Sequence, residues 1–309
     1  MPQRILVTPR SLTSEPHPDI ERLKEQGFDI VYSTPGAIPT EAELLELVPG
    51  CVGWLAGVEP VTARIIDAAS DLKVISRNGV GVDNLPLDML NQRGVRIMVA
   101  EGANSFGVAE LTIGLLFSAL RSIPFADAGI KSGGWPRVRG IEIRGRTTGI
   151  IGCGAIGREV ARMVIALGAS VIAFDPLRPN LDFPSSAFSY ADVDDVISNA
   201  DVVSLHCPLP ADGSTLLHRR RLFAAKNGMV LINTARAGLV DEDALIDALD
   251  AGRIGYYATD VFEPEPPVSL GLASHQHVIA TSHIGGFTAE SVDRATRLAA
   301  DNLVAALRP

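Results

Sequence analysis

The chain has 309 residues, enough for two domains with sizeable hydrophobic cores. A formal net charge of -9, with 47% hydrophobic and 20% charged residues, fits an ordinary globular protein and argues against nucleic acid or an anionic membrane as main partner. No apolar run reaches the roughly 18 residues of a membrane span, and the segment MPQRILVTPR indicates a strand, not a signal peptide. The three cysteines are far apart, so we expect free thiols and a cytoplasmic protein. His275 and His277 lack a third ligand, so we expect no metal.

Residues 1–100 alternate between short apolar runs and amphipathic stretches. The pattern predicts helices near 18–26, 40–47, 61–69 and 86–92. It predicts the intervening strands at 4–8, 28–33, 52–56, 74–77 and 96–99. Such alternation is typical of a parallel, doubly wound sheet, so this part should form one small α/β domain.

Two segments of different character follow. Residues 105–122 form an apolar helical stretch that should be buried, either between domains or in a subunit interface. Residues 133–146 are rich in glycine, arginine and proline without a regular period, which indicates a loop or arm.

The stretch 147–175 carries the most informative pattern. An apolar run at 147–151 indicates a buried strand, and Gly152, Gly154 and Gly157 follow it in the G-x-G-x-x-G register. Glycines at this strand-to-helix turn allow a tight turn, a close approach to a pyrophosphate, and close helix packing. The next strand ends in Asp175, whose carboxylate can accept hydrogen bonds from a ribose and would repel a 2′-phosphate. The stretch therefore predicts an NAD-binding unit.

The alternation resumes after residue 175 and predicts a second α/β domain. Helices are expected near 190–198, 218–226 and 241–251, and strands at 202–206, 229–234, 256–260 and 278–281. A last helix within 288–307 has an apolar stripe and should pack back onto the first domain.

Three polar residues stand where ligands bind in open α/β sheets, beyond the carboxyl ends of strands. Arg236 follows the strand at 229–234, and its planar guanidinium suits a carboxylate. His283 follows the last strand and can exchange a proton with a hydroxyl or carbonyl oxygen. Glu265 lies between them in sequence and could hold the other imidazole nitrogen.

The chain resembles the D-2-hydroxyacid dehydrogenase family of NAD-dependent enzymes over essentially its whole length. The matching motifs, in family order, are RNGVGVDN (77–84), GCGAIG (152–157), FDP (174–176), HCPL (206–209), NTARAGLVDEDAL (233–245), DVFEPEP (260–266) and SHIGG (282–286). The resemblance implies two Rossmann-like domains and makes His283 the acid/base, Glu265 its partner and Arg236 the ligand of the substrate carboxylate.

The resemblance also implies the remaining site residues. A second carboxylate cradle would be formed by Asn78, Gly79, Val80 and Gly81, beside Arg236 and His283. Cofactor contacts would involve Gly152, Gly154, Ala155, Ile156, Gly157, Asp175, His206, Cys207, Pro208, Thr234, Ala235, Arg236, Asp260, His283, Gly285 and Gly286. Residues 1–100, completed by 287–309, would bind substrate, 101–286 would bind NAD, and the 101–145 arm would form a homodimer.

The substrate is the least determined expectation. The motifs are closest to the phosphoglycerate dehydrogenase branch in a short form, so 3-phosphoglycerate and 3-phosphohydroxypyruvate come first. Gly57, however, lies near where such enzymes often place an arginine for the phosphate. Arg77 remains, and Arg10, Arg137 and Arg139 are either substitutes for the missing arginine or solvated surface charge. The alternatives are a glyoxylate or hydroxypyruvate reductase, a phosphite dehydrogenase, and, in another class, an NAD-sensing, corepressor-like binding protein.

Overall fold

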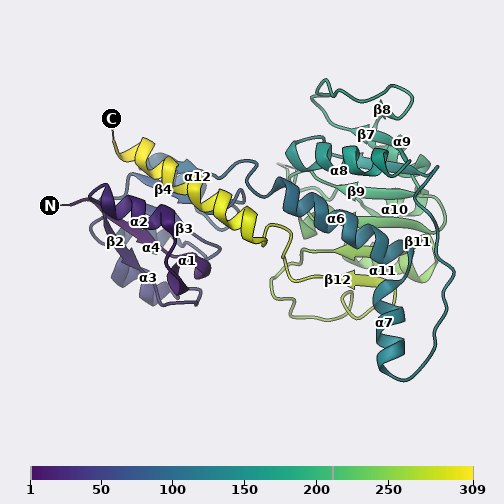
Figure 1. The fold of residues 1–309 in the computed structure, drawn as a ribbon, viewed down its shortest axis with the longest axis horizontal. Coiled ribbons are helices and arrows are strands. Elements are labelled where there is room, and N and C mark those ends of the chain that lie inside the picture. Colours follow the sequence, from purple (N-terminus) through teal and green to yellow (C-terminus); the bar gives the residue numbers. More distant parts are fainter. Residues whose placement is uncertain (1, 211, 309) are drawn as a thin grey trace. The chain divides into compact units, whose positions relative to one another are not determined.

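The computed structural model describes residues 2–210 and 212–308 and divides into two compact units, 1–104 with 288–309 and 105–287. The division falls a few residues beyond the boundaries at 100 and 286 that the sequence suggests. Each unit is built on a parallel sheet, as predicted (Figure 1).

Unit 1 has five parallel strands in the order β2-β1-β3-β4-β5. The strands are β1 (Arg4–Val7), β2 (Asp29–Tyr32), β3 (Cys51–Ala56), β4 (Val74–Arg77) and β5 (Arg96–Met98). The helices are α1 (Arg10–Ser14), α2 (Pro18–Glu25), α3 (Glu41–Leu47), α4 (Ala63–Ala68), α5 (Leu87–Gln92) and α12 (Ala289–Leu307).

The C-terminal helix completes the unit 1 core, which confirms the discontinuous first domain. On one face of the sheet, Leu303 and Leu307 of α12 pack with Ile5, Ile20 and Leu23 of β1 and α2. Figure 1 shows α12, in yellow, beside α2 of the same unit. Helices α3, α4 and α5 supply the core of the other face. Strand β1 and helix α12 are far apart in the sequence. They are held together by burial of apolar side chains, the dominant favourable term in folding.

Unit 2 has seven parallel strands in the order β12-β11-β10-β9-β6-β7-β8. The strands are β6 (Thr147–Ile151), β7 (Ser170–Phe174), β8 (Phe188–Tyr190), β9 (Val202–Leu205), β10 (Met229–Asn233), β11 (Ile254–Thr259) and β12 (Val278–Ala280). The helices are α6 (Ser105–Leu120), α7 (Ile123–Lys131), α8 (Ala155–Ala166), α9 (Val193–Asn199), α10 (Arg219–Ala224), the 3₁₀ turn η1 (Ala237–Leu239) and α11 (Glu242–Asp250). The order reverses between β6 and β9, and such a switch point is where doubly wound sheets bind ligands.

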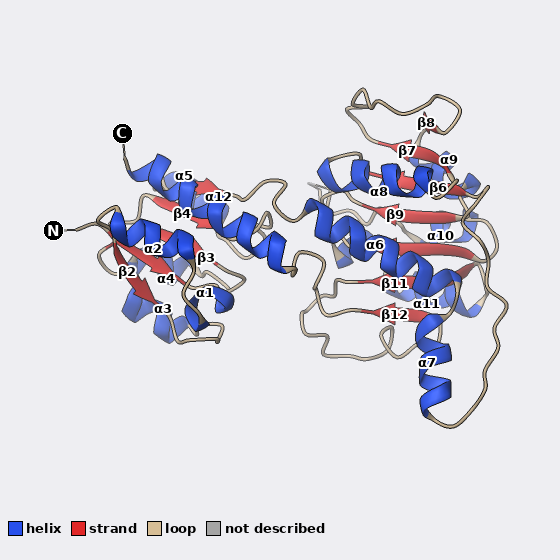
Figure 2. Ribbon diagram, viewed as in Figure 1, coloured by secondary structure: helices blue, strands red, loops and turns tan. Residues whose placement is uncertain are grey.

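Helix α6 packs in the core of its own unit. It lies beside α8 on one face of the sheet, against β10 and β11, and Phe106 near its start is exposed, so its place in a domain or subunit interface stays a prediction (Figure 2). Its apolar circumference follows from packing on both sides, because one side meets β10 and β11 while another meets α8. Ser122 then takes a left-handed conformation with φ of 49°, which ends α6 and starts the separate helix α7.

Among the described residues, no single helix has the length and apolar character to cross a membrane, although α6 and α7 together, bent by 65°, pass that test by length and composition.

Candidate active site

The glycine turn between β6 and α8 is closely packed. Gly152 has a φ of +96°, and a Cβ there would lie 2.5 Å from the carbonyl oxygen of His206. A Cβ on Gly157 would lie 1.9 Å from the oxygen of Gly152. At Gly154, in contrast, nothing lies within 4 Å of the position of a Cβ. The turn therefore requires glycine at two positions for packing and leaves open space at the third.

The N-terminus of α8 is suited to an anion. Its first turn contains no acidic residue, and no side chain caps it, so the first amides, at Ala155, Ile156 and Gly157, have no competing acceptor from a cap. Unsatisfied amides and the helix dipole favour a phosphate at this end. With the open space at Gly154, this donor set fits the pyrophosphate of NAD.

Asp175 is fixed beside the glycine turn. Its Oδ2 accepts a hydrogen bond from the amide of Cys153 at 2.7 Å, and its Oδ1 accepts one from the amide of Leu177 at 2.9 Å. Strands β6 and β7 pair up to Ile151 and Phe174, so the carboxylate stands at the same sheet edge as the glycines. A half-buried acid held there can accept from ribose hydroxyls and disfavours a 2′-phosphate.

The HCP segment after β9 forms a wall of the same turn. The ring of His206 is bonded through Nε2 to Ser204 Oγ at 2.8 Å, and burial lowers the pKa of His206 to about 3, so the ring is neutral. Burial raises the pKa of the Cys207 thiol to about 11, which leaves no thiolate for nucleophilic chemistry at neutral pH. Pro208 is exposed. This segment contributes backbone and shape to the cofactor site.

The turn that carries Arg236 is held by Asn233, the first residue of the motif at 233–245, to which no role was given from the sequence. The buried Asn233 amide accepts from the Ala235 amide at 3.0 Å and donates to the Arg236 oxygen at 2.8 Å and to Tyr257 Oη at 3.2 Å. Thr234 Oγ1 lies 3.1 Å from Thr112 Oγ1 of α6. An Asn at a strand end was the available signal, because this residue type often bonds its own turn.

The structure brings His283 and Glu265 together. His283 Nδ1 lies 2.7 Å from Glu265 Oε2, and Glu265 Oε1 accepts from the amide of Phe262 at 2.9 Å. The two side chains are 55% and 37% exposed. Within the described residues, His283 Nε2 has no protein hydrogen-bond partner. A histidine oriented by a carboxylate through one nitrogen, with the other directed to solvent, is the arrangement of a general acid or base.

Asp260 holds the loop that carries His283. The residue is 2% exposed, its Oδ1 accepts from Thr281 Oγ1 at 2.6 Å and from the Ile284 amide at 2.8 Å, and its Oδ2 accepts from the Gly285 amide at 2.8 Å. These bonds fix a loop in which His283 has a φ of +55°, unusual for a residue other than glycine. A contact between Asp260 and the nicotinamide carboxamide stays a prediction, as do those of Gly285 and Gly286.

The expected carboxylate cradle of unit 1 follows β4, with one correction. The amide of Asn78 donates to the Ala56 oxygen at 2.9 Å, so it continues the sheet and is not free for a ligand. Within residues 2–210 and 212–308, the amides of Gly79, Val80 and Gly81 have no protein acceptor. Arg77 Nε donates to the Gly81 oxygen at 2.8 Å and so holds the far end of the turn.

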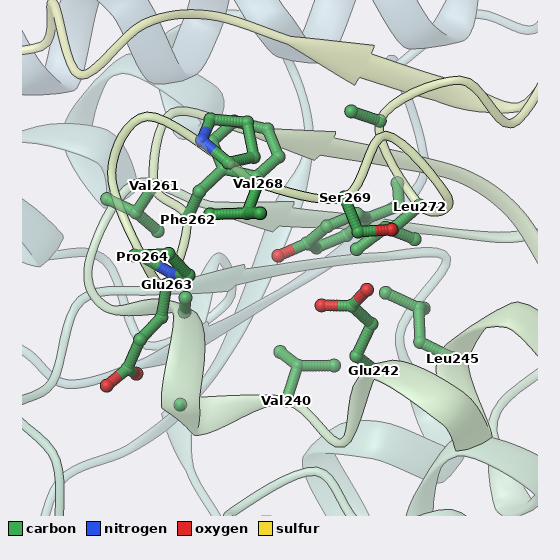
Figure 3. Close-up of a pocket in the computed structure, with 15 residues that line it drawn as sticks. Val240, Glu242, Leu245, Val261, Phe262, Glu263, Pro264, Val268, Ser269 and Leu272 are labelled. Atoms are coloured by element: carbon green, nitrogen blue, oxygen red, sulfur yellow. The ribbon is translucent and has the colours of Figure 1, made fainter.

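A pocket of about 430 Å³ lies next to two of these segments and contains none of the fingerprint glycines. Its wall includes Ala237 and Gly238, which follow Arg236, and Phe262 to Pro264, which precede Glu265. In Figure 3 the carboxylate of Glu242 points in among apolar side chains, whereas that of Glu263 points away. Within the described residues, no group of three or more His, Cys, Asp or Glu side chains could hold a metal ion.

Comparison with known proteins gives consistent matches. A family model described as D-isomer specific 2-hydroxyacid dehydrogenase, NAD binding domain, matches residues 113–285. A hydroxypyruvate reductase of Thermotoga maritima is 37% identical over 258 residues, which are 82% of this chain and 83% of the relative. A D-3-phosphoglycerate dehydrogenase of Methanocaldococcus jannaschii is 37% identical over 302 residues, 96% of this chain and 57% of the relative. The chain thus spans little more than half the length of such phosphoglycerate dehydrogenases.

Solved structures resemble the fold as well. The crystal structure of the TT0316 protein from Thermus thermophilus matches with a TM-score of 0.87 at 35% identity, covering 99% of this chain and 97% of that one. These matches confirm the resemblance found in the sequence. The chain belongs to the D-isomer specific 2-hydroxyacid dehydrogenase family, NAD-dependent oxidoreductases that act on CH–OH groups, and residues 113–285 belong to its NAD-binding domain.

Proposed function

We propose that the protein interconverts a 2-oxo acid and the corresponding D-2-hydroxy acid, with unit 1 as the substrate-binding domain. The observation that carries this proposal is the pair formed by His283 Nδ1 and Glu265 Oε2 at 2.7 Å, held in the NAD-binding domain on a loop fixed by Asp260. When bound, NAD supplies or accepts the hydride at C2.

The residues of the chain supply the proton and the binding energy. In reduction, His283 donates a proton from Nε2 to the oxygen on C2, and in oxidation it accepts that proton. Glu265 fixes the ring through Nδ1. Arg236 binds the substrate carboxylate and places positive charge where the alkoxide develops. The amides of Gly79, Val80 and Gly81 would bind a second carboxylate oxygen. Orientation and electrostatic stabilisation together lower the barrier.

The phosphorylated substrate pair and its unphosphorylated counterpart undergo the same reaction at C2 and differ only in the substituent on C3. The relatives include both D-3-phosphoglycerate dehydrogenases and a hydroxypyruvate reductase, so the phosphorylated and unphosphorylated acids are the first to compare. A spectrophotometric panel of NADH oxidation would contain 3-phosphohydroxypyruvate, hydroxypyruvate, glyoxylate, pyruvate and 2-oxoglutarate, with NADPH as the cofactor control. Silence across the panel with NADH still bound would refute the proposed activity and favour either a phosphite dehydrogenase or the NAD-sensing class.

The role of His283 has a direct test. His283→Ala should lower kcat by at least about 100-fold, because positioned acid–base groups contribute typically 10²–10⁴-fold, while the Kd for NADH changes little. His218→Ala is the matched control, since His218 lies in the same unit before α10 and makes no side-chain cap. An unchanged kcat in His283→Ala would remove this residue from the mechanism.

We also propose a homodimer formed through the 101–145 arm. None of the residues of α7 is buried, and its Ile123, Phe125 and Ile130 are exposed, as is Trp135 in the following segment. Contiguous exposed apolar side chains mark protein interfaces. A cytoplasmic location is proposed as well, because Cys51, Cys153 and Cys207 are all free thiols.

A further inference from the structure

The ligand-binding edge of the unit 1 sheet contains a buried carboxylate to which the proposed mechanism gives no role. Strands β1, β3 and β4 are neighbours, and Thr8, Glu59 and Arg77 lie at or just beyond their carboxyl ends. Glu59 is only 1% exposed, and Thr8 is equally buried. Carboxylates are rarely buried unless they are paired, so this one requires an explanation.

Neighbouring donors hold Glu59 in one position. Its Oε1 accepts hydrogen bonds from Thr8 Oγ1 and from the amide of Gly57, the latter at 2.9 Å. Trp54 Nε1 donates to Thr8 Oγ1 at 3.0 Å, which directs the Thr8 proton toward the carboxylate. The main-chain oxygen of Glu59 accepts from Asn84 Nδ2 at 2.5 Å. Both the side chain and the backbone of Glu59 are therefore fixed.

Glu59 also determines what the loop after β3 can present. A Cβ on Gly57 would lie 2.7 Å from Glu59 Oε2 and 3.1 Å from Pro9 Cα, so a side chain at position 57 would require the Glu59 carboxylate to move away. The amide of Gly57 is already bonded to Glu59 and cannot bind an anion. The loop exposes Val58, at 65%, together with Pro60 and Thr62. Residues 57–62 therefore contain no cationic side chain, and the carboxylate of Glu59 is their only charged group.

The guanidinium of Arg77 is a buried cation whose charge interacts with this carboxylate. Arg77 is 6% exposed, and its Nη1 has no hydrogen-bond partner among the described residues. Burial lowers the pKa of Arg77, and the negative charges of Glu59 and then Asp83 oppose that shift. The charge of Arg77 is thus partly compensated from within the protein. A phosphate carries a charge of roughly −1.5 to −2 at pH 7, so the fixed negative charge of Glu59 at this edge disfavours its binding.

We propose that Glu59 is a specificity-determining residue and that the substrate is an unphosphorylated 2-oxo or 2-hydroxy acid whose C3 substituent is small and uncharged. Glu59 acts through its charge and by closing position 57, not by touching the reacting atoms. This inference rests on the proposed function, because it concerns the acid that the same site reduces. It argues for hydroxypyruvate or glyoxylate over 3-phosphohydroxypyruvate.

The test is a ratio of kcat/KM values for hydroxypyruvate and 3-phosphohydroxypyruvate, measured on the full chain by NADH oxidation. The wild-type ratio should exceed about 100, and Glu59→Gln, which keeps an acceptor at Oε1 but removes the charge, should lower it at least tenfold. A purely structural role would affect both acids alike and leave the ratio unchanged. Glu25→Gln is the control, because Glu25 is an exposed acid at the end of α2, leading into β2 at the opposite edge of the sheet.

A second variant decides the matter if Glu59→Gln does not fold. Val58→Arg adds a cation at an exposed position without disturbing the buried cluster, and it should also lower the ratio at least tenfold. A wild-type preference for the phosphorylated acid would overturn the inference while leaving the proposed function intact. So would an unchanged ratio in Glu59→Gln, or in Val58→Arg where Glu59→Gln does not fold. No turnover of any 2-oxo acid would instead overturn the proposed function.

Discussion

The carboxylate of Asp260 should be essential for holding His283, and Asp260→Asn tests this with almost no change in volume. Three donors meet the carboxylate, from Thr281, Ile284 and Gly285, at 2.6–2.8 Å. An amide can accept from two of them, and its NH₂ group must then face the third. Hydrogen bonds to a charged group contribute about 1.5–3 kcal/mol and neutral ones about 1, while a buried unsatisfied donor costs about 1–3 kcal/mol. The loss for this loop is therefore at least about 3 kcal/mol.

The variant should destabilise the loop conformation that positions His283 by this amount. Asp260 is almost completely buried, so solvent does not screen its hydrogen bonds. At about 1.36 kcal/mol for each factor of ten, kcat should fall by at least about 100-fold. Steady-state NADH oxidation with the best acid of the panel gives kcat, and thermal unfolding gives Tm. Asp243→Asn in α11 is the control, since it removes the same charge from an exposed site in the same unit.

A partner variant makes the reasoning stricter. Thr281→Val removes a single donor to Asp260 and should cost about 1–2 kcal/mol, less than Asp260→Asn. The double variant should cost less than the sum of the two, because the residues share one bond. If Asp260→Asn kept kcat within threefold of wild type and left Tm unchanged, the loop would be held by something other than this carboxylate.

Three further predictions follow from single contacts. Gly157→Ala places a Cβ 1.9 Å from the oxygen of Gly152, a backbone clash that should cost about 3 kcal/mol and lower Tm by about 6–12 °C in thermal unfolding; an unchanged Tm would mean that the turn can relax. Asp175→Ser removes the acid that disfavours a 2′-phosphate and should raise the NADPH to NADH ratio of kcat/KM at least tenfold, whereas a constant ratio would place discrimination elsewhere. Phe125→Glu puts a charge on the exposed face of α7 and should yield monomers in sedimentation analysis; a wild type that is itself monomeric would refute the dimer.

The architecture was predictable because its signals are local and repeated. Strands that are buried on both faces appear as short apolar runs, and helices between them show the 3.6-residue period. Elements without such a signal were missed. Strand β8 has three residues at the sheet edge; the sequence pattern assigned two of them to no element and placed the third, Tyr190, at the start of a helix. Helix α7 fell between the expected helix at 105–122 and the expected loop at 133–146 and was assigned to neither, and α1 has only five residues.

The chemistry of the site was predictable to the extent that it depends on residue type at a strand end. His283, Glu265 and Arg236 met that condition, and the contact between the first two is present at 2.7 Å. The residues that hold them gave weaker signals. The bonds of Asn233 and Asp260 depend on which amide or hydroxyl the folded turn brings to them, and this cannot be inferred from spacing alone.

Glu59 illustrates the limit most clearly. A glutamate between a valine and a proline in a turn has the pattern of solvated surface charge, and its burial depends on Thr8, 51 residues earlier in the chain. The 3-phosphoglycerate substrate expected from the motifs stays a prediction, because those motifs bind the cofactor and the groups at C2. Under our proposal, the distinction between the acids lies in the loop beyond β3, where a Cβ at position 57 would lie 2.7 Å from Glu59 Oε2.

The same kind of contact occurs at three strand ends, and it suggests how enzymes of one fold can differ in substrate. A buried polar side chain at or beyond a strand end binds the backbone of a functional turn: Asn233 at the Arg236 turn, Asp260 at the His283 loop, and Glu59 at Gly57. The first two lie in the NAD-binding unit and hold the groups that act on C2, so changing them should reduce turnover with every acid. Glu59 lies in the other unit, so its replacement should change which acid is used. Substrate choice can therefore diverge through the loops of unit 1 while the chemistry at C2 is preserved.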